Sequence, residues 1–132
     1  MDTNCACGSG NAYANCCEPI IIGKKNAPTA ESLMRSRYVA FTLANIDYLM
    51  LSHHFSSRPN KERKSIAKWA KSVKWIGLTI LNSQDGQQTD IRGTVEFKAL
   101  YIEDGVLSHI HENSLFQREN EKWVYVSGQM LD

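Results

Sequence analysis

The distribution of cysteine is uneven, and its absence from most of the chain is informative. All four cysteines lie within the first 17 of 132 residues, and the rest of the chain has none. No apolar run approaches the roughly 20 residues of a transmembrane helix, so no membrane span is expected. The polar start also lacks the basic end and apolar centre of a secretory signal. We therefore expect a cytoplasmic protein whose thiols stay reduced.

The chain also has little net charge. Fifteen Lys and Arg residues nearly balance fourteen Asp and Glu residues, for a net charge of +1, and 42% of the residues are hydrophobic. This composition suits one folded domain with a small appendage. The charges are segregated, however, because a basic segment (58–74) precedes an acidic region (85–132). Such a separation indicates either a partner surface or faces that are merely solvated.

The cysteines follow the pattern Cys5-x-Cys7, eight residues, then Cys16-Cys17. Disulfides would link only the tip of the chain, and adjacent Cys16 and Cys17 do not easily meet disulfide geometry. Four thiolates instead supply one tetrahedral, structural zinc site per chain, with no open position for a substrate. The segment 8–10, Gly-Ser-Gly, allows the tight turn that this site needs. We predict a zinc knuckle over residues 1–22, with these metal ligands: Cys5, Cys7, Cys16 and Cys17.

Three helices are predicted after a polar linker over residues 18–28. The first begins after Thr29, a favourable N-cap residue, and breaks near Asn45. A short second helix is expected over 47–53, and an amphipathic third helix follows Pro59. The third helix carries a basic face made of Lys61, Lys64, Lys68 and Lys71.

After the third helix, the apolar period changes to two. Strands are expected over 75–81, 94–102, 107–118 and 123–126. A turn over 82–86 and the Asp104-Gly105 pair indicate hairpin connections. Helices followed by antiparallel strands predict an α+β domain, with the helices on one face of a curved sheet.

Residues 5–17, C-A-C-G-S-G-N-A-Y-A-N-C-C, resemble the SEC-C motif, C-x-C-G-S-G-x-x-[YF]-x-x-C-[CH]. The resemblance implies zinc binding and docking of other proteins, including an export chaperone, or of the ribosome. The usual proline between the first two cysteines is replaced by Ala6. The basic residues common after G-S-G are replaced by Asn11 and Ala12, which removes positive charge from the tip.

The rest of the chain resembles the bacterial YchJ family. The shared segments, in order, are L-M-R-S-R-Y-x-A-F, V-E-F-x-A-x-Y, H-E-x-S-x-F and W-x-Y-V-x-G. This resemblance implies a cone-shaped domain, similar to nuclear transport factor 2 (NTF2) and the cystatin-like group, over residues 29–128. Many members carry a second SEC-C motif at the C-terminus, a copy that we expect this chain, ending at Asp132, to lack.

Folds of this kind often hold a cavity between sheet and helices. Strand alternation places His109 and His111 on one face and Glu112 and Ser114 on the other, so only one of the two pairs can face inward. An internal ion pair between Glu112 and Arg35 is one structural use of these groups. Catalysis would need a base, His111 or Glu112, beside a donor, Tyr38 or Tyr101, but no sequence feature determines that geometry, so no catalytic residue is assigned. The candidate lining residues are Arg35, Arg37, Tyr38, Tyr101, His109, His111, Glu112 and Ser114.

The leading interpretation is a non-enzymatic zinc-containing adapter. Its SEC-C knuckle would contact a protein partner or the ribosome, and the α+β domain would serve as scaffold. The first alternative is a small-molecule binding protein or enzyme that uses the cavity. The second is RNA contact through the basic third helix; DNA is not an expected partner.

Overall fold

The computed structural model describes residues 4–132 and contains a helical part followed by a sheet. Residues 1–3, the start of the predicted 1–22 motif, lie outside the described residues. The helical elements are η1 (Tyr13–Asn15), α1 (Glu18–Ile21), α2 (Ala30–Thr42), α3 (Ile46–Leu51), η2 (Asn60–Glu62) and α4 (Arg63–Ser72). The strands are β1 (Lys74–Asp85), β2 (Arg92–Glu103), β3 (Val106–Glu119) and β4 (Lys122–Met130).

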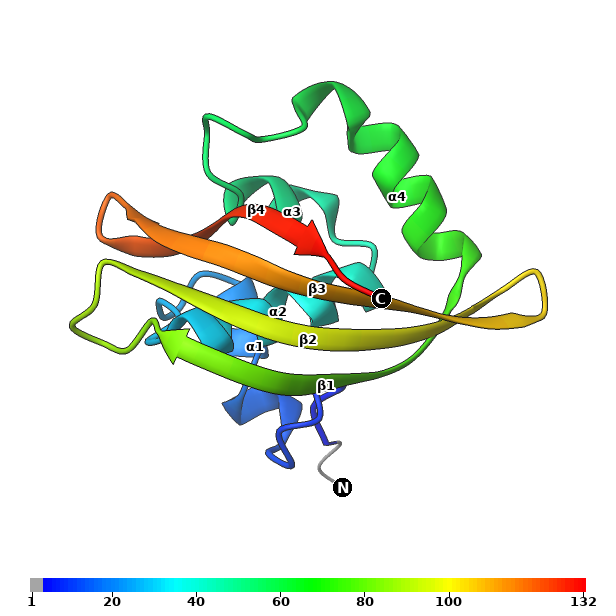
Figure 1. Ribbon diagram of the computed structural model, residues 1–132, viewed down its shortest axis with the longest axis horizontal. Coiled ribbons are helices and arrows are strands. Elements are labelled where there is room, and N and C mark those ends of the chain that lie inside the picture. The colour runs from blue at the N-terminus through cyan, green and yellow to red at the C-terminus, as the bar shows by residue number, and fades with distance from the viewer. Residues whose placement is uncertain (1–3) are drawn as a thin grey trace.

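The four strands form one antiparallel sheet in the order β1-β2-β3-β4, with each strand paired to the next along the chain. The sheet is curved, and α2 lies across one of its faces (Figure 1). The predicted α+β class, with helices followed by an antiparallel sheet, is therefore confirmed. No helix among residues 4–132 has the length and apolar character needed to cross a membrane.

Local hydrogen bonds define where the helices begin. Thr29 and Ser32 form a reciprocal capping box at the start of α2, with distances of 3.0 and 3.1 Å from backbone nitrogen to side-chain oxygen. The Asn45 side chain accepts a hydrogen bond from the backbone of Tyr48 at 3.1 Å and caps α3. The predicted end of that helix at His53 is wrong, because α3 ends at Leu51 and His53 bridges to β4.

Two other boundaries differ from the prediction. Residues 18–28 are not all linker, since α1 occupies Glu18–Ile21 and buries Ile20. The expected turn over 82–86 is also wrong, because β1 continues to Asp85 and pairs with β2 there. Two register shifts interrupt β1, so its residues do not alternate regularly between the two faces.

The core lies between α2 and the inner face of the sheet. Val95 and Phe97 of β2 and Phe116 of β3 are each at most 4% exposed and belong to one buried cluster with Leu33 of α2. Where α2 begins, the backbone N–H of Ala30 donates to the carbonyl of Gly86 at 2.9 Å. This bond joins the start of α2 to the end of β1, so the helix is held along the sheet.

Candidate functional site

The four cysteine sulfurs converge in one small cluster. All four Sγ atoms lie within 4.8 Å of one another, with Cys7 and Cys16 separated by 3.7 Å and Cys16 and Cys17 by 3.9 Å. None of the four forms a disulfide. A tetrahedron with four zinc–sulfur bonds of about 2.3 Å has sulfur–sulfur edges of about 3.8 Å. The cluster is therefore able to bind one tetrahedral metal ion.

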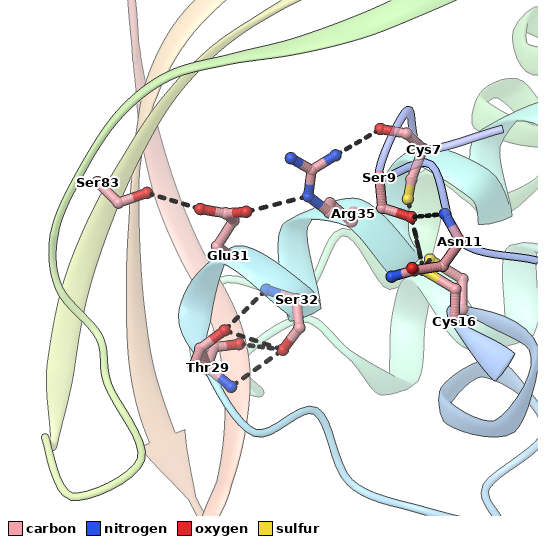
Figure 2. Close-up of polar contacts among 10 residues, drawn as sticks. Cys7, Ser9, Asn11, Cys16, Thr29, Glu31, Ser32, Arg35 and Ser83 are labelled. Carbon is pink, nitrogen blue, oxygen red and sulfur yellow. Dashed lines mark hydrogen bonds and ion pairs between the residues drawn. The ribbon is translucent and has the colours of Figure 1, made fainter. Parts of the chain in front are cut away.

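A tight turn brings the two cysteine pairs together. Gly8 and Gly10 adopt φ angles of +82° and +87°, which disfavour other residues. The backbone N–H of Cys5 donates to the carbonyl of Asn11 at 2.7 Å and closes the loop. The Ser9 hydroxyl lies 3.2 Å from the sulfur of Cys16, as Figure 2 shows, and can donate to a thiolate there.

The knuckle is built into the domain. Cys5, Cys7 and Cys17 are each at most 4% exposed and belong to the main buried cluster. Arg35 of α2 donates from Nη1 to the carbonyl of Cys7 at 2.6 Å and from Nε to Glu31 at 3.1 Å. Figure 2 shows this chain of contacts from the knuckle through α2. The knuckle is thus held in one orientation relative to the helix.

The thiols of Cys5, Cys7 and Cys17 differ in pKa. The pKa of Cys7 is lowered to about 4, chiefly because the thiol of Cys17 donates a hydrogen bond to it. The pKa of Cys17 is raised by the same interaction and by burial, and burial raises the pKa of Cys5. A cation must displace the remaining thiol protons, so metal binding releases protons and weakens at low pH.

A cavity of about 480 Å³ opens between the helices and the inner face of the sheet. Aromatic side chains form much of its wall: Tyr38, Phe41, Trp69 and Trp75. The rings of Trp69 and Trp75 meet edge to face, with centroids 5.4 Å apart. The charged groups that reach the cavity are Arg37 from α2 and Glu112 from β3.

Arg37 is a buried cation, 6% exposed. Its Nη1 donates to the carbonyl of Leu49 at 2.9 Å and to the hydroxyl of Ser52 at 2.7 Å. Its guanidinium lies 4.8 Å from the ring centroid of Tyr125. Burial lowers the pKa of Arg37 to about 10, which leaves it charged at neutral pH. Within residues 4–132, Arg37 forms no ion pair with a carboxylate.

Glu112 is held by two hydroxyl groups. It accepts from Tyr125 at 3.2 Å and from Ser114 at 3.0 Å. Burial, and next the charge of Glu112, raise the pKa of Tyr125, which therefore stays protonated as a donor. Gly128 makes room for this carboxylate, because a Cβ at that position would lie 1.7 Å from Oε1 of Glu112.

The candidate residues from the sequence are distributed over four places. Arg37, Tyr38 and Glu112 line the cavity, and Ser114 lies behind Glu112. Tyr101 packs against Trp69 and Trp75 outside the lining. His109 and His111 are on the other face of the sheet, where Nε2 of His111 lies 2.7 Å from Glu96. The suggested ion pair between Arg35 and Glu112 does not form, because Arg35 binds the knuckle instead.

Among the cavity residues that sequence reasoning missed are His53 and Tyr125, which contact each other. The two rings meet edge to face at 4.9 Å, and Nε2 of His53 lies 3.1 Å from the Ser57 hydroxyl. Burial, followed by the charges of Arg37 and Arg58, lowers the pKa of His53 to about 4. The contact between His53 and Tyr125 joins segments that are far apart in the chain, so no local sequence pattern indicated it.

The basic residues of the third predicted helix project into solvent. Lys61 lies in η2, and Lys64, Lys68 and Lys71 lie on α4; all four are exposed. Within the described part of the chain, none of them forms an ion pair. They therefore form a basic surface that no acidic side chain neutralises directly.

Comparisons with known proteins agree over nearly the whole chain. The family model described as "YchJ, middle NTF2-like domain" matches residues 29–128. A UPF0225 protein of Geobacter sulfurreducens is 39% identical over 128 residues, which cover 97% of this chain and 80% of that protein. A UPF0225 protein of Bordetella pertussis is 43% identical over 128 residues, which cover 96% of this chain and 92% of that protein.

Two solved structures, each of a SEC-C motif containing protein, are also similar. The solution structure from Rhodopseudomonas palustris has a TM-score of 0.88 and 32% identity, covering 98% of this chain and 100% of that one. The crystal structure from Psychrobacter arcticus has a TM-score of 0.80 and 27% identity, covering 97% of this chain and 82% of that one.

Proposed function

The chain belongs to the YchJ (UPF0225) family, and from this premise we propose that it is a zinc-containing adapter. In this proposal the SEC-C knuckle docks a partner protein, and the NTF2-like domain is the scaffold that holds it. The observation that carries the proposal is the cluster of four sulfurs, three of them from cysteines buried in the domain core. A knuckle fixed in this way presents its outer surface at a constant orientation.

Zinc is the metal that best suits these ligands. Four soft thiolates in a tetrahedral arrangement favour zinc or an iron–sulfur centre over hard cations such as magnesium or calcium. Sulfur separations of 3.7 and 3.9 Å agree with a single central ion. Because all four positions would be filled by protein, this zinc serves structure and supplies no site for a substrate.

The outer surface of the knuckle favours a protein partner over a phosphate backbone. Over the described range 4–22, none of the exposed residues carries charge; they are Asn4, Ala6, Gly8, Gly10, Asn11, Ala14, Asn15 and Ile22. Nucleic-acid binding relies on Lys and Arg that neutralise phosphates, whereas protein interfaces use neutral contacts and hydrogen bonds. If the partner is the ribosome, this uncharged surface suits contact with a ribosomal protein better than contact with ribosomal RNA.

The test separates the docking surface from the metal. Ala14→Arg and Asn15→Arg change exposed positions and keep all four ligands, and Thr89→Arg adds the same charge at an exposed site on the β1–β2 loop. We expect zinc content of about one ion per chain in all three variants. A partner captured by the wild-type protein, identified and then purified, should bind the Thr89 variant normally and lose affinity for the other two. Equal binding by all three variants would contradict the adapter proposal.

Two other functions have narrower support. Small-molecule binding is favoured by the cavity of about 480 Å³ with a buried cation in its wall. RNA contact is favoured only by the exposure of the lysines on α4.

A further inference from the structure

We infer that the cavity binds a small aromatic carboxylic acid, with its carboxylate on Arg37 and a hydroxyl or amino group beside that carboxylate facing Glu112. This inference goes beyond the adapter proposal and does not depend on the metal site. It rests on the hydrogen bonds of Arg37, on the position of Glu112 and on the apolar walls.

Arg37 has one edge committed to the protein and one edge open. Nη1 is used by the Leu49 carbonyl and the Ser52 hydroxyl. Nε and Nη2 have no hydrogen-bond partner within residues 4–132, and neither atom is fully enclosed by protein. These two nitrogens form the side of a guanidinium that binds both oxygens of a carboxylate. Because Arg37 lines the cavity, this open edge is the place for an anionic group.

The acidic side chain nearest this position does not serve as the partner of Arg37. Glu112 is held by Tyr125 and Ser114, while Arg37 lies over the ring of the same tyrosine. The two charges therefore flank Tyr125 without meeting in an ion pair. The carboxylate of a ligand bound to Arg37, with no other polar group beside it, would be repelled by the negative charge of Glu112. A hydroxyl or ammonium group next to the carboxylate removes that conflict, because it donates to Glu112.

The rest of the cavity suits an apolar body. Tyr38, Phe41, Trp69 and Trp75 present aromatic faces and edges, and Ile66 of α4 extends this apolar wall. A volume of about 480 Å³ accommodates a molecule with a single ring and a short polar chain. Aromatic walls and a ring-bearing ligand gain from edge and stacking contacts.

Titration with five related compounds tests the inference. The probes are L-phenyllactate, L-phenylalanine, 3-phenylpropanoate, 3-phenylpropan-1-ol and 2-phenylethylamine. Binding is followed by tryptophan fluorescence, to which Trp69 and Trp75 contribute from the cavity wall. We expect saturable binding of at least one of the first two, weaker binding of 3-phenylpropanoate, and affinity about tenfold or more lower for the probes without a carboxylate. The better of phenyllactate and phenylalanine then identifies the donor as hydroxyl or ammonium. Equal affinity of 3-phenylpropanoate and 3-phenylpropan-1-ol would overturn the inference. Failure of all three carboxylic acids to bind would overturn it as well.

Two variants in the cavity wall and two controls locate the site. Arg37→Gln should abolish the preference for carboxylates, while Arg92→Gln, at an exposed position at the start of β2 outside the cavity lining, should leave every affinity unchanged. Since loss of a buried arginine can disturb folding, Ile66→Trp provides a second route, because it fills the apolar end and should exclude all probes. Unaltered phenyllactate and phenylalanine binding in a folded Arg37 or Ile66 variant would refute the site. Ala14→Arg should bind the probes normally, so a failed adapter proposal and a failed cavity assignment give different results.

Discussion

His53 shows how one buried side chain can make stability depend on pH. The residue is 9% exposed, and its ring lies between β4 and the loop that follows α3, where Tyr125 and Ser57 contact it. Its pKa falls from 6.5 to about 4 because burial, Arg37 and Arg58 all oppose a positive charge. The native state therefore favours the neutral ring.

We expect acid to destabilise the wild-type protein through His53. Its folded pKa lies below its unfolded pKa, so the unfolded chain binds the proton first as pH falls. The stabilising contribution is present above about pH 6.5 and is lost between about pH 6.5 and pH 4, up to about 3 kcal/mol. Urea unfolding at a series of pH values should show a steeper loss for wild type than for His53→Gln. Parallel pH dependences would contradict this role, and the comparison cancels the acid sensitivity of the metal site.

Gly128 provides the space in which Glu112 sits. A methyl group there would overlap Oε1, Cδ and Cγ of Glu112, with distances from 1.7 to 2.8 Å. We expect Gly128→Ala to lower the free energy of unfolding by about 1–3 kcal/mol, as for other overpacked sites. In a Glu112→Ala background the methyl has room, so the cost of Gly128→Ala should largely disappear. Additive effects in this double-mutant cycle, measured by urea unfolding, would show that the two positions do not interact.

At the scale of elements, α4 has two different sides. Ile66 and Trp69 line the cavity, while the lysines on the opposite side are exposed. The lysine side of such a helix is equally compatible with a purely solvated surface and with contact to an anionic partner.

The RNA alternative makes a specific prediction for α4. Replacing Lys64, Lys68 and Lys71 with Gln should weaken co-sedimentation with ribosomes, because phosphate contacts release counterions. The slope of log affinity against log salt should flatten by up to about 0.7–0.9 per lost phosphate contact. The matched control replaces three exposed lysines elsewhere, Lys24, Lys25 and Lys122. Equal behaviour of the two triple variants would show that the α4 surface is solvated and makes no specific contact.

At the scale of the whole molecule, the cysteine cluster and the domain core form one structure. Three cysteines are buried in the main apolar cluster, and Arg35 joins the knuckle to α2. If the cluster holds an ion, as we propose, its loss should therefore destabilise parts of the domain beyond the first 17 residues.

We expect Cys7→Ser to abolish stoichiometric zinc binding and to lower the melting temperature by about 10 °C. A structural zinc site contributes directly to folding, and about 1 kcal/mol corresponds to roughly 4 °C in a domain of this size. Ser9→Ala, which removes the hydroxyl beside Cys16 and no ligand, should keep about one zinc per chain. Metal analysis and thermal melts followed by tryptophan fluorescence check both statements. An unchanged melting temperature in the zinc-free variant would mean that the knuckle contributes little to the core.

The features determined by the sequence alone are local ones. Convergence of the four thiols follows from short spacing around a Gly-Ser-Gly turn, and the start of α2 follows from the Thr29 cap, because the interacting groups are close along the chain. The change of apolar period after α4 likewise predicted the order of helices and strands. Where the periodicity is broken by register shifts, as in β1, or the residues are mostly exposed, as at the end of β4, the strand limits were missed.

Only the tertiary structure decided which polar groups meet. Arg35 and Arg37 point about 160° apart around one helix, so only one of them can face the cavity, and nothing local indicates that it is Arg37. The contacts between His53 and Tyr125 and between Arg35 and Cys7 join segments distant in the chain. Such contacts depend on how α2, α3 and β4 pack together, a property of the assembled fold that no short window of sequence contains.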